Sequence, residues 1–344
     1  MLSRNPLRRS DTVNALERMS TRQQTRVVPI RVCARGRDFV IRLKLEAGNR
    51  WGSIKDRTAI GLVASVASRL DDASATIIES TSGNLGAALA MIAKELDRRF
   101  IAVVDPKLSA IVAARMTAAG ATLDFVREPD RHGGYLDARL ARVAELLEAI
   151  PGAVWTDQYH NPANPLVHRT STGPELFRQA GDCDSAFVAV STGGTLAGIS
   201  QYLRPRGPWI RLIAVDVPGS RVFGEPAGPR LLSGIGASRA SSFLTPADWD
   251  DVMIVDDETA IAACHQVRDA TGLCLGGSSG AVVAACVRYL IREPDVTAPV
   301  CVCPDGGASY AHTIYNEDWL RGKAIDLARW QLPVSFEAIE ITDE

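Results

Sequence analysis

Residues 185–198 read SAFVAVSTGGTLAG, and this stretch decides the expected fold. Its first part is apolar without alternation, which favours a short strand buried on both faces of a sheet. A glycine-rich loop then opens an apolar segment with helical spacing. A buried strand, a glycine-rich loop and a helix in this order indicate a parallel sheet with helices packed on its faces.

The same alternation continues on both sides of this stretch. We expect further strands at 37–46, 75–80, 100–105, 122–126, 209–217 and 298–304, and helices at 53–70, 82–99, 108–120, 135–150, 193–204, 258–272 and 278–292. Proline and asparagine concentrate between residues 150 and 165, which favours a domain boundary there. The chain is therefore expected to be an α/β protein with two domains.

The composition excludes several classes of protein. The 344 residues, 46% of them hydrophobic, can bury a sizeable core without metal or disulfide help. A formal net charge of −2 leaves no basic surplus for binding nucleic acid, and no apolar run approaches the roughly 18 residues that cross a bilayer. The seven cysteines show no CxxC spacing, so we expect free, mostly buried thiols in a cytoplasmic protein and no metal site.

Several loops open predicted helices at the carboxyl ends of strands, where parallel sheets bind ligands. STGGTLAG at 191–198 presents glycine N–H groups to an anion such as phosphate, and STSGNLG at 80–86 suits a carboxylate. GGSSGA at 276–281 offers a serine hydroxyl to a ring nitrogen or an anion. An ordinary turn with a helix cap also explains each of these loops taken alone.

The fourth loop, GSIKDR at 52–57, carries a lysine. A helix N-terminus and partial burial both lower the pKa of an amine, and such an amine can form a Schiff base, whereas arginine cannot. The alternative is a surface lysine beside Asp56. Few other amines are available, because the lysines are only Lys44, Lys55, Lys94, Lys107 and Lys323.

Together the four loops resemble the cysteine synthase / β-substituted alanine synthase family of fold type II pyridoxal 5'-phosphate (PLP) enzymes, over about residues 40–320. DQYHNPANPLVHRTSTGPEL at 157–176 is a further match. The resemblance implies two parallel-sheet three-layer domains of the tryptophan synthase β-like fold, and a homodimer. The implied parts are an N-terminal arm at 1–26, a smaller substrate-carboxylate-binding domain at 47–158, a larger PLP-phosphate-binding domain made of 27–46 and 159–326, and a C-terminal tail at 327–344.

The resemblance also implies a role for each matching residue. Lys55 would hold the cofactor and act as general base, Asn84 would bond the PLP ring hydroxyl, and Ser278 would face the pyridine nitrogen. The remaining matches are Ser191, Thr192, Gly193, Gly194 and Thr195 for the phosphate, Ser80, Thr81, Ser82, Gly83 and Gln158 for the substrate, and Gly234 at the opening of the site.

The implied reaction is β-replacement on an O-activated L-serine through an α-aminoacrylate intermediate. Ser80 stands where cysteine synthases usually have proline, and Leu85 where they usually have threonine. One branch of the family makes N-(2-amino-2-carboxyethyl)-L-glutamate, a precursor of 2,3-diaminopropionate, from O-phospho-L-serine and L-glutamate in secondary amino-acid biosynthesis. Segments that resemble this branch lie at 127–140, 220–224, 234–239 and 310–320. Arg221 and Arg239 are candidates for binding the anionic groups.

Four alternatives stay open at this point. A cysteine synthase would join O-acetylserine or O-phosphoserine to sulfide on the same fold. A serine/threonine dehydratase would release a keto acid, although Asn84-Leu85 replaces the Asn-His pair usual in those enzymes. An NAD-binding oxidoreductase would need a GxGxxG after a strand, and a non-catalytic relative would lack a catalytic group, whereas none is missing.

Overall fold

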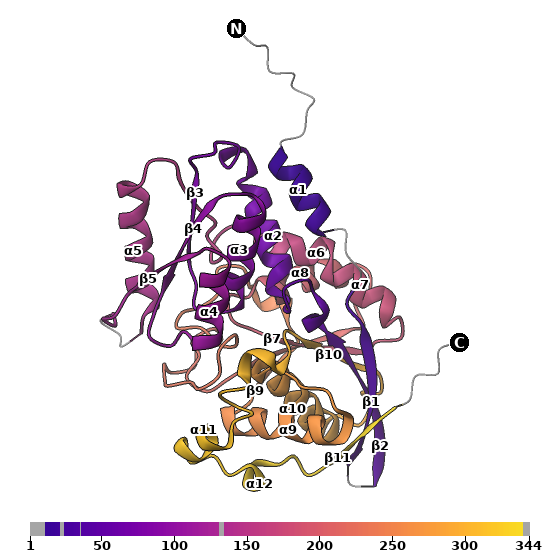
Figure 1. Ribbon diagram of the computed structural model, residues 1–344. Coiled ribbons are helices and arrows are strands. Elements are labelled where there is room, and N and C mark those ends of the chain that lie inside the picture. Colours follow the sequence, from indigo (N-terminus) through magenta and orange to yellow (C-terminus); the bar gives the residue numbers. More distant parts are fainter. Residues whose placement is uncertain (1–10, 21–23, 35, 131–133, 340–344) are drawn as a thin grey trace. The chain divides into compact units, whose positions relative to one another are not determined.

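A computed structural model of the chain describes residues 11–20, 24–34, 36–130 and 134–339 (Figure 1). The chain divides into two compact units. Unit 1 consists of residues 1–23 and 55–163, and unit 2 consists of residues 24–54 and 164–344. Each unit contains its own sheet and its own hydrophobic core.

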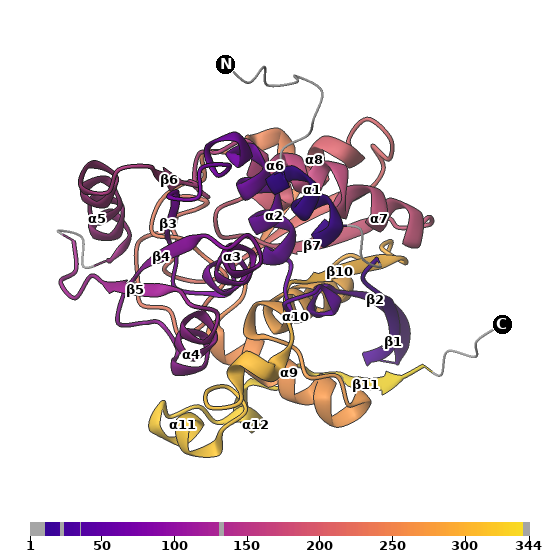
Figure 2. The same ribbon diagram turned by 45° about the horizontal axis from the view of Figure 1, so that its top comes forward.

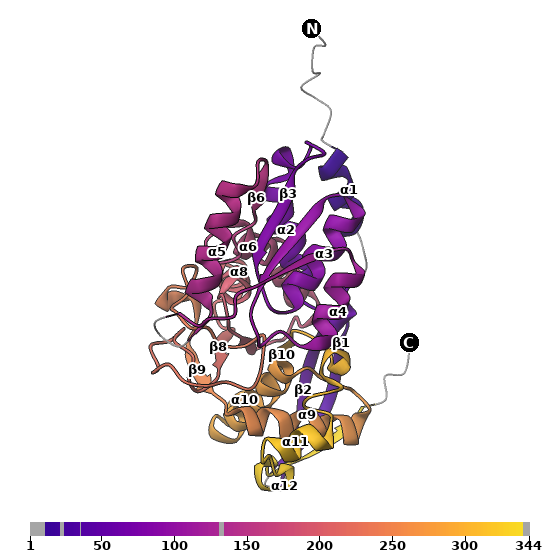
Figure 3. The same ribbon diagram turned by 60° about the vertical axis from the view of Figure 1, so that its left-hand side comes forward.

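Unit 1 is built on a four-stranded sheet of order β5-β4-β3-β6, in which all strands run parallel. The strands are β3 (Thr76–Ser80), β4 (Arg99–Val104), β5 (Thr122–Phe125) and β6 (Ala153–Trp155), and the helices are α1 (Asp11–Ser20), α2 (Lys55–Ser65), α3 (Asn84–Glu95), α4 (Ala110–Ala118) and α5 (Leu136–Ala149). Figure 3 shows α5 on one face of this sheet, and α3 and α4 on the other. The central strand β3 is buried along its whole length, including its polar residues Thr76, Glu79 and Ser80.

Unit 2 is built on a seven-stranded sheet of order β11-β1-β2-β10-β7-β8-β9. The strands are β1 (Val27–Ala34), β2 (Arg37–Leu45), β7 (Ser185–Ala189), β8 (Arg211–Asp216), β9 (Asp251–Ile254), β10 (Pro299–Cys303) and β11 (Ser335–Ala338). The helices are α6 (Ala163–Thr170), α7 (Thr172–Gln179), α8 (Gly194–Leu203), α9 (Asp257–Thr271), α10 (Gly277–Arg292), α11 (Glu317–Gly322) and α12 (Leu327–Trp330).

Successive residues of the central strands pack on opposite faces of the unit 2 sheet. Phe187 and Ile213 lie in a core with residues of α9 and α10, whereas Val188 and Ala214 lie in a second core with residues of α7 and α8. Figure 2 shows α9 and α10 running side by side. Helices therefore cover both faces, and the α/β architecture expected from the sequence is confirmed.

The sequence pattern does not indicate an antiparallel edge in unit 2. Strand β1 runs antiparallel to β2 and to β11, while β2, β10, β7, β8 and β9 run parallel. Figure 1 shows β11, near the C-terminal end of the described chain, beside β1. Strand β2 lies between β1 and β10, and its residues 41–43 alternate between buried and half-buried, whereas β10 is buried along its whole length.

The segment expected to be an N-terminal arm contains helix α1, which packs on α2 within unit 1. Thr12 Oγ1 donates a hydrogen bond to Asp71 Oδ1 at 3.0 Å. Residues 1–10 and 21–23 of this segment, and residues 340–344 of the expected tail, lie outside the described residues. No helix among the described residues has the length and apolar character needed to cross a membrane. All seven cysteines are free, and all except Cys33 and Cys274 are buried.

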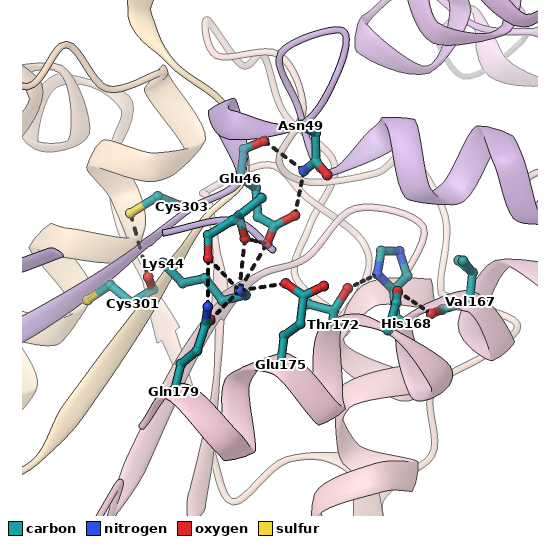
Figure 4. Close-up of polar contacts among 12 residues, drawn as sticks. Lys44, Glu46, Asn49, Val167, His168, Thr172, Glu175, Gln179, Cys301 and Cys303 are labelled. Carbon is teal, nitrogen blue, oxygen red and sulfur yellow. Dashed lines mark hydrogen bonds and ion pairs between the residues drawn. The ribbon is translucent and has the colours of Figure 1, made fainter. Parts of the chain in front are cut away.

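A buried ion network lies at the end of β2 (Figure 4). Lys44 is fully buried, and its Nζ lies 3.0 Å from Glu175 Oε2 and 3.7 Å from Glu46 Oε1. Gln179 Oε1 accepts a further hydrogen bond from Lys44 Nζ at 2.8 Å. Such a network is destabilised strongly when one partner is removed, because the charges left behind are buried without compensation.

We therefore expect Lys44→Met to lower the free energy of unfolding by about 3–5 kcal/mol. Urea unfolding of the purified protein measures this change. Lys323→Met is the control, because Lys323 is exposed in the same unit, and it should change the unfolding free energy by less than about 0.5 kcal/mol. An equally small effect of Lys44→Met would show that the network adds nothing to stability.

Candidate active site

In unit 1, the loop after β3 has the predicted form of an anion site. β3 ends at Ser80 and α3 begins at Asn84, with Gly83 as its N-terminal cap and no side-chain hydrogen bond at that cap. A Cβ atom built on Gly83 would meet no atom within 4 Å, so open space lies beside the loop there. Ser80 Oγ is buried and has no hydrogen-bond partner among the described residues. A ligand with acceptor oxygens suits these features.

Gln158, which follows β6, lies against this loop. Its Nε2 donates a hydrogen bond to the carbonyl oxygen of Ser80 at 2.7 Å. β6 pairs with β3 in the sheet, so the carboxyl ends of the two strands meet at one edge. The structure thus brings together the two segments of unit 1 that the resemblance assigns to the substrate.

A buried arginine that the sequence analysis missed completes this end of unit 1. Arg139 of α5 is 8% exposed, and its Nη1 donates a hydrogen bond to Ser82 Oγ at 3.3 Å. Its Nε lies 3.4 Å from Asp105 Oδ2 but makes no hydrogen bond to any described residue. The detectable signal was its position on the buried stripe of α5, which is otherwise apolar and consists of Leu136, Val143 and Leu146.

In unit 2, the loop after β7 presents backbone donors at the start of α8. Gly193 has φ = 90°, a left-handed conformation that favours glycine, and α8 begins at Gly194. Among the residues that the structure describes, none accepts a hydrogen bond from the backbone N–H groups of Gly193, Gly194 or Thr195. N–H groups without such a partner at the positive end of a helix fit a phosphate group, such as that of PLP.

Helix α6 supports this loop through two buried side chains. Asn164 Nδ2 donates to Thr192 Oγ1 at 3.3 Å, and His168 Nε2 lies 3.3 Å from Thr195 Oγ1. The other ring nitrogen of His168 lies 2.9 Å from Thr172 Oγ1, a contact visible in Figure 4. The sequence analysis did not connect any histidine with the site, because His168 lies 27 residues from Thr195 along the chain.

Gly193→Ala is expected to weaken PLP binding at least about tenfold. A Cβ atom at this position would lie 2.2 Å from Ser241 Oγ, and Ser241 Oγ donates to the Thr192 carbonyl oxygen at 2.7 Å. The dissociation constant of PLP, titrated into the apoprotein by absorbance, measures the effect. Gly181→Ala is the control in the same unit, since a Cβ atom there meets nothing within 4 Å. Equal PLP affinity of the two variants would rule out this role for the loop.

Ser278 lies in the first turn of α10, in a fully buried polar group. Its Oγ is 3.5 Å from Asp305 Oδ1, and Asp305 Oδ2 accepts a hydrogen bond from the Tyr310 hydroxyl at 2.8 Å. Burial, together with the charge of Asp305, raises the pKa of Tyr310, so its hydroxyl stays protonated and donates. A Cβ atom on Gly234 would lie 3.9 Å from Ser278 Oγ, which places these two predicted residues together. A neutral hydroxyl here fits a pyridine nitrogen.

Lys55 begins α2, and the residues just before it are held within unit 2. The N–H of Ile54 donates to the Pro304 carbonyl oxygen at 2.8 Å, and Ser53 pairs with Asp305 in an isolated antiparallel bridge. Asp305 is also the residue that Ser278 contacts. The backbone of Ser53 and Ile54 is therefore fixed beside Pro304 and Asp305 within unit 2.

Backbone donors for an anion, a neutral hydroxyl and a lysine that opens a helix are the features that a PLP enzyme requires. The sequence model of the family described as "Pyridoxal-phosphate dependent enzyme" matches residues 19–305, and the chain belongs to this family. Its cofactor is PLP, as the four loops predict.

The chain is similar to two bacterial enzymes named N-(2-amino-2-carboxyethyl)-L-glutamate synthase. The one from Ralstonia nicotianae is 42% identical over 287 residues, which are 83% of this chain and 85% of the relative. The one from Cupriavidus metallidurans is 40% identical over 288 residues, which are 82% of this chain and 84% of the relative.

Solved structures share the fold. The O-acetylserine-dependent cystathionine β-synthase of Helicobacter pylori superposes with a TM-score of 0.77 at 29% identity, covering 90% of this chain and 100% of that one. O-ureido-L-serine synthase with O-ureido-L-serine bound gives a TM-score of 0.79 at 27% identity, covering 90% of this chain and 98% of that one. The resemblance to the β-substituted alanine synthases, and the fold that it implies, are confirmed.

Proposed function

We propose that this enzyme replaces the phosphate of O-phospho-L-serine by the amino group of L-glutamate, forming N-(2-amino-2-carboxyethyl)-L-glutamate and inorganic phosphate. The observation that carries the proposal is Arg139, a buried cation in contact with Ser82 of the carboxylate loop. A buried guanidinium selects for an anionic group on the substrate. Of the arginines considered from sequence, Arg221 is exposed and Arg239 is half-buried. The names of the two bacterial relatives support the same reaction.

PLP supplies an electron sink that labilises the α-proton of an amino acid and allows its β-substituent to leave. We assign to Lys55 the attachment of the cofactor and the transfer of the α-proton. Asn84 would bond the ring hydroxyl, and the Ser278 hydroxyl would face the ring nitrogen without a charge. The phosphate would rest on Ser191, Thr192, Gly193, Gly194 and Thr195.

The substrate is assigned to unit 1. Thr81, Ser82, Gly83 and the Gln158 amide would bind the α-carboxylate, together with the unpartnered Ser80 hydroxyl. Arg139 would donate to the phosphate of the donor and stabilise the charge that develops as it leaves. In this assignment the smaller domain binds the substrate carboxylate and the larger domain binds the cofactor phosphate, with Gly234 near Ser278 at the opening of the site.

We further propose a cytoplasmic homodimer that serves secondary amino-acid biosynthesis and binds no nucleic acid. The family resemblance supports the dimer and the pathway. The cysteines support a reducing compartment, because all seven are free and most of them are buried as small apolar groups.

A panel of two donors and two acceptors tests the function. The purified enzyme receives O-phospho-L-serine or O-acetyl-L-serine, each with L-glutamate or sulfide, and mass spectrometry identifies the products. We expect the N-linked adduct of glutamate from phosphoserine. Incorporation of sulfide without any incorporation of glutamate would instead identify a cysteine synthase, and release of a keto acid from serine would identify a dehydratase.

A further inference from the structure

Glu79, the residue before Ser80, is fully buried at the carboxyl end of β3. Its carboxylate accepts several hydrogen bonds from two different segments. Oε1 accepts from the Ser80 N–H at 2.9 Å and from Trp155 Nε1 at 3.4 Å. Oε2 accepts from Thr156 Oγ1 at 2.6 Å and from the Gln158 N–H at 3.2 Å. One side chain therefore fastens the end of β3 to the segment that follows β6.

The two segments that Glu79 joins are those assigned to the α-carboxylate of the substrate. Ser80 begins the loop, and Gln158 carries the amide that reaches the Ser80 carbonyl oxygen at 2.7 Å. The Ser80 N–H is available only because this chain has serine where cysteine synthases usually have proline, which lacks an N–H group. Without an acceptor at Glu79, the N–H groups of Ser80 and Gln158 would be buried without this partner, and the loop could shift away from Gln158.

We propose that Glu79 is a positioning residue, whose carboxylate holds Gln158 and the Ser80–Gly83 loop in the arrangement that binds the substrate's α-carboxylate. The inference rests on the proposed function, since it takes these segments as the carboxylate site. Glu79 itself touches neither substrate nor cofactor in this account. Its effect reaches the reaction through the two segments that it joins.

The ionisation state of Glu79 determines how many hydrogen bonds its carboxyl group can accept. Burial raises the pKa of Glu79 to about 7, while the hydrogen bonds from Thr156, Trp155 and Gln158 act in the opposite direction. The elements packed against β3 bring other charged groups to this end of the sheet. They are Asp157 after β6, whose charge raises the pKa further, and the ion pair of Asp105 after β4 with Arg139 of α5.

Only the ionised carboxylate can accept hydrogen bonds from all four donor groups, because protonation turns one of its oxygens into a donor. Ionisation of Glu79 strengthens this hydrogen bonding but lowers the stability of the fold. The pKa of Glu79 is raised on folding, so its stabilising contribution is complete below the unfolded value of 4.5 and is lost as the pH rises through about 7. The state that positions the loop best is therefore the state that stabilises the fold least.

The test compares Glu79→Gln with the wild-type holoenzyme at several pH values. Glutamine keeps the shape of the side chain but replaces one acceptor oxygen by a donor, as protonation does. We expect the KM for phosphoserine to rise about tenfold or more at pH 8, with kcat nearly unchanged and the cofactor absorbance identical. The ratio of the variant KM to the wild-type KM should fall towards one at about pH 6, where wild-type Glu79 is itself protonated.

A merely structural role would not produce this pattern. Because the ionised carboxylate costs stability, Glu79→Gln should resist urea at pH 8 at least as well as the wild type. Asp124→Asn is the matched control, since it replaces a carboxylate by an amide in β5 of the same sheet, where Asp124 pairs with Arg142. It should leave the KM unchanged at every pH.

A KM ratio that stays near one, or that does not change with pH, would overturn the proposal. L-alanine binds without reacting, and the change in cofactor absorbance measures its dissociation constant. The ratio of this constant in the variant to that in the wild type should depend on pH as the KM ratio does. If the wild type does not join phosphoserine to glutamate, the proposed function is wrong. The ratio of the dissociation constants for L-alanine still tests the role of Glu79.

Discussion

Lys55→Ala is expected to remove the absorbance band at about 410–420 nm and to lower kcat by at least about 10⁴-fold. The assigned amine both attaches the cofactor and moves the α-proton, so a single substitution removes covalent attachment and the general base together. Absorbance spectra of the purified protein with added PLP, and turnover of phosphoserine with glutamate, measure the two losses.

The controls are the other lysines of unit 1. Lys94 and Lys107 are exposed, and their replacement by alanine should leave both the band and the rate in place. Retention of the band in Lys55→Ala, or its loss in Lys107→Ala, would contradict the assignment of Lys55.

Arg139→Gln is expected to lower kcat/KM for O-phospho-L-serine about 100-fold, and to lower it much less for O-acetyl-L-serine. The guanidinium of Arg139 is buried beside Ser82, and its Nε has no hydrogen-bond partner among the described residues. A charge-assisted contact with the phosphate is lost in the variant, whereas a neutral acetyl group does not depend on it. Steady-state kinetics with both donors measure the difference.

Arg142→Gln provides the matched control on the same helix. Arg142 forms its ion pairs with Asp124 and Glu145, away from the carboxylate loop. The Arg142→Gln variant should keep the wild-type preference for O-phospho-L-serine over O-acetyl-L-serine. An equal loss with both donors in Arg139→Gln would show that the arginine supports the loop and does not recognise the phosphate.

The sequence predicts the parts of the site that lie close together along the chain. A buried strand followed by glycines and a helix start is a local pattern, so the loops at 80–86, 191–198 and 276–281 fall where expected, each at the start of a helix. The lysine is also predictable, since lysine is scarce and Lys55 alone opens a helix after a glycine-containing loop.

Contacts between distant segments could not be predicted in this way. Arg139 lies 57 residues from Ser82, and Glu79 lies 79 residues from Gln158. Their importance comes from burial and from partners that only the folded sheet brings together. The antiparallel strand β1 was missed although it pairs with the neighbouring β2, because residues 1–30 show no clear periodicity and were interpreted as an arm. Its second partner, β11, lies at the other end of the chain.

The most direct test of the account locates the bond between the cofactor and the chain. The holoenzyme is reduced with sodium borohydride, digested, and its peptides are examined by mass spectrometry. The account predicts that the pyridoxyl group, with its phosphate, is found on the peptide that contains Lys55. A pyridoxyl group on Lys44, Lys94, Lys107 or Lys323, or on no peptide at all, would contradict it.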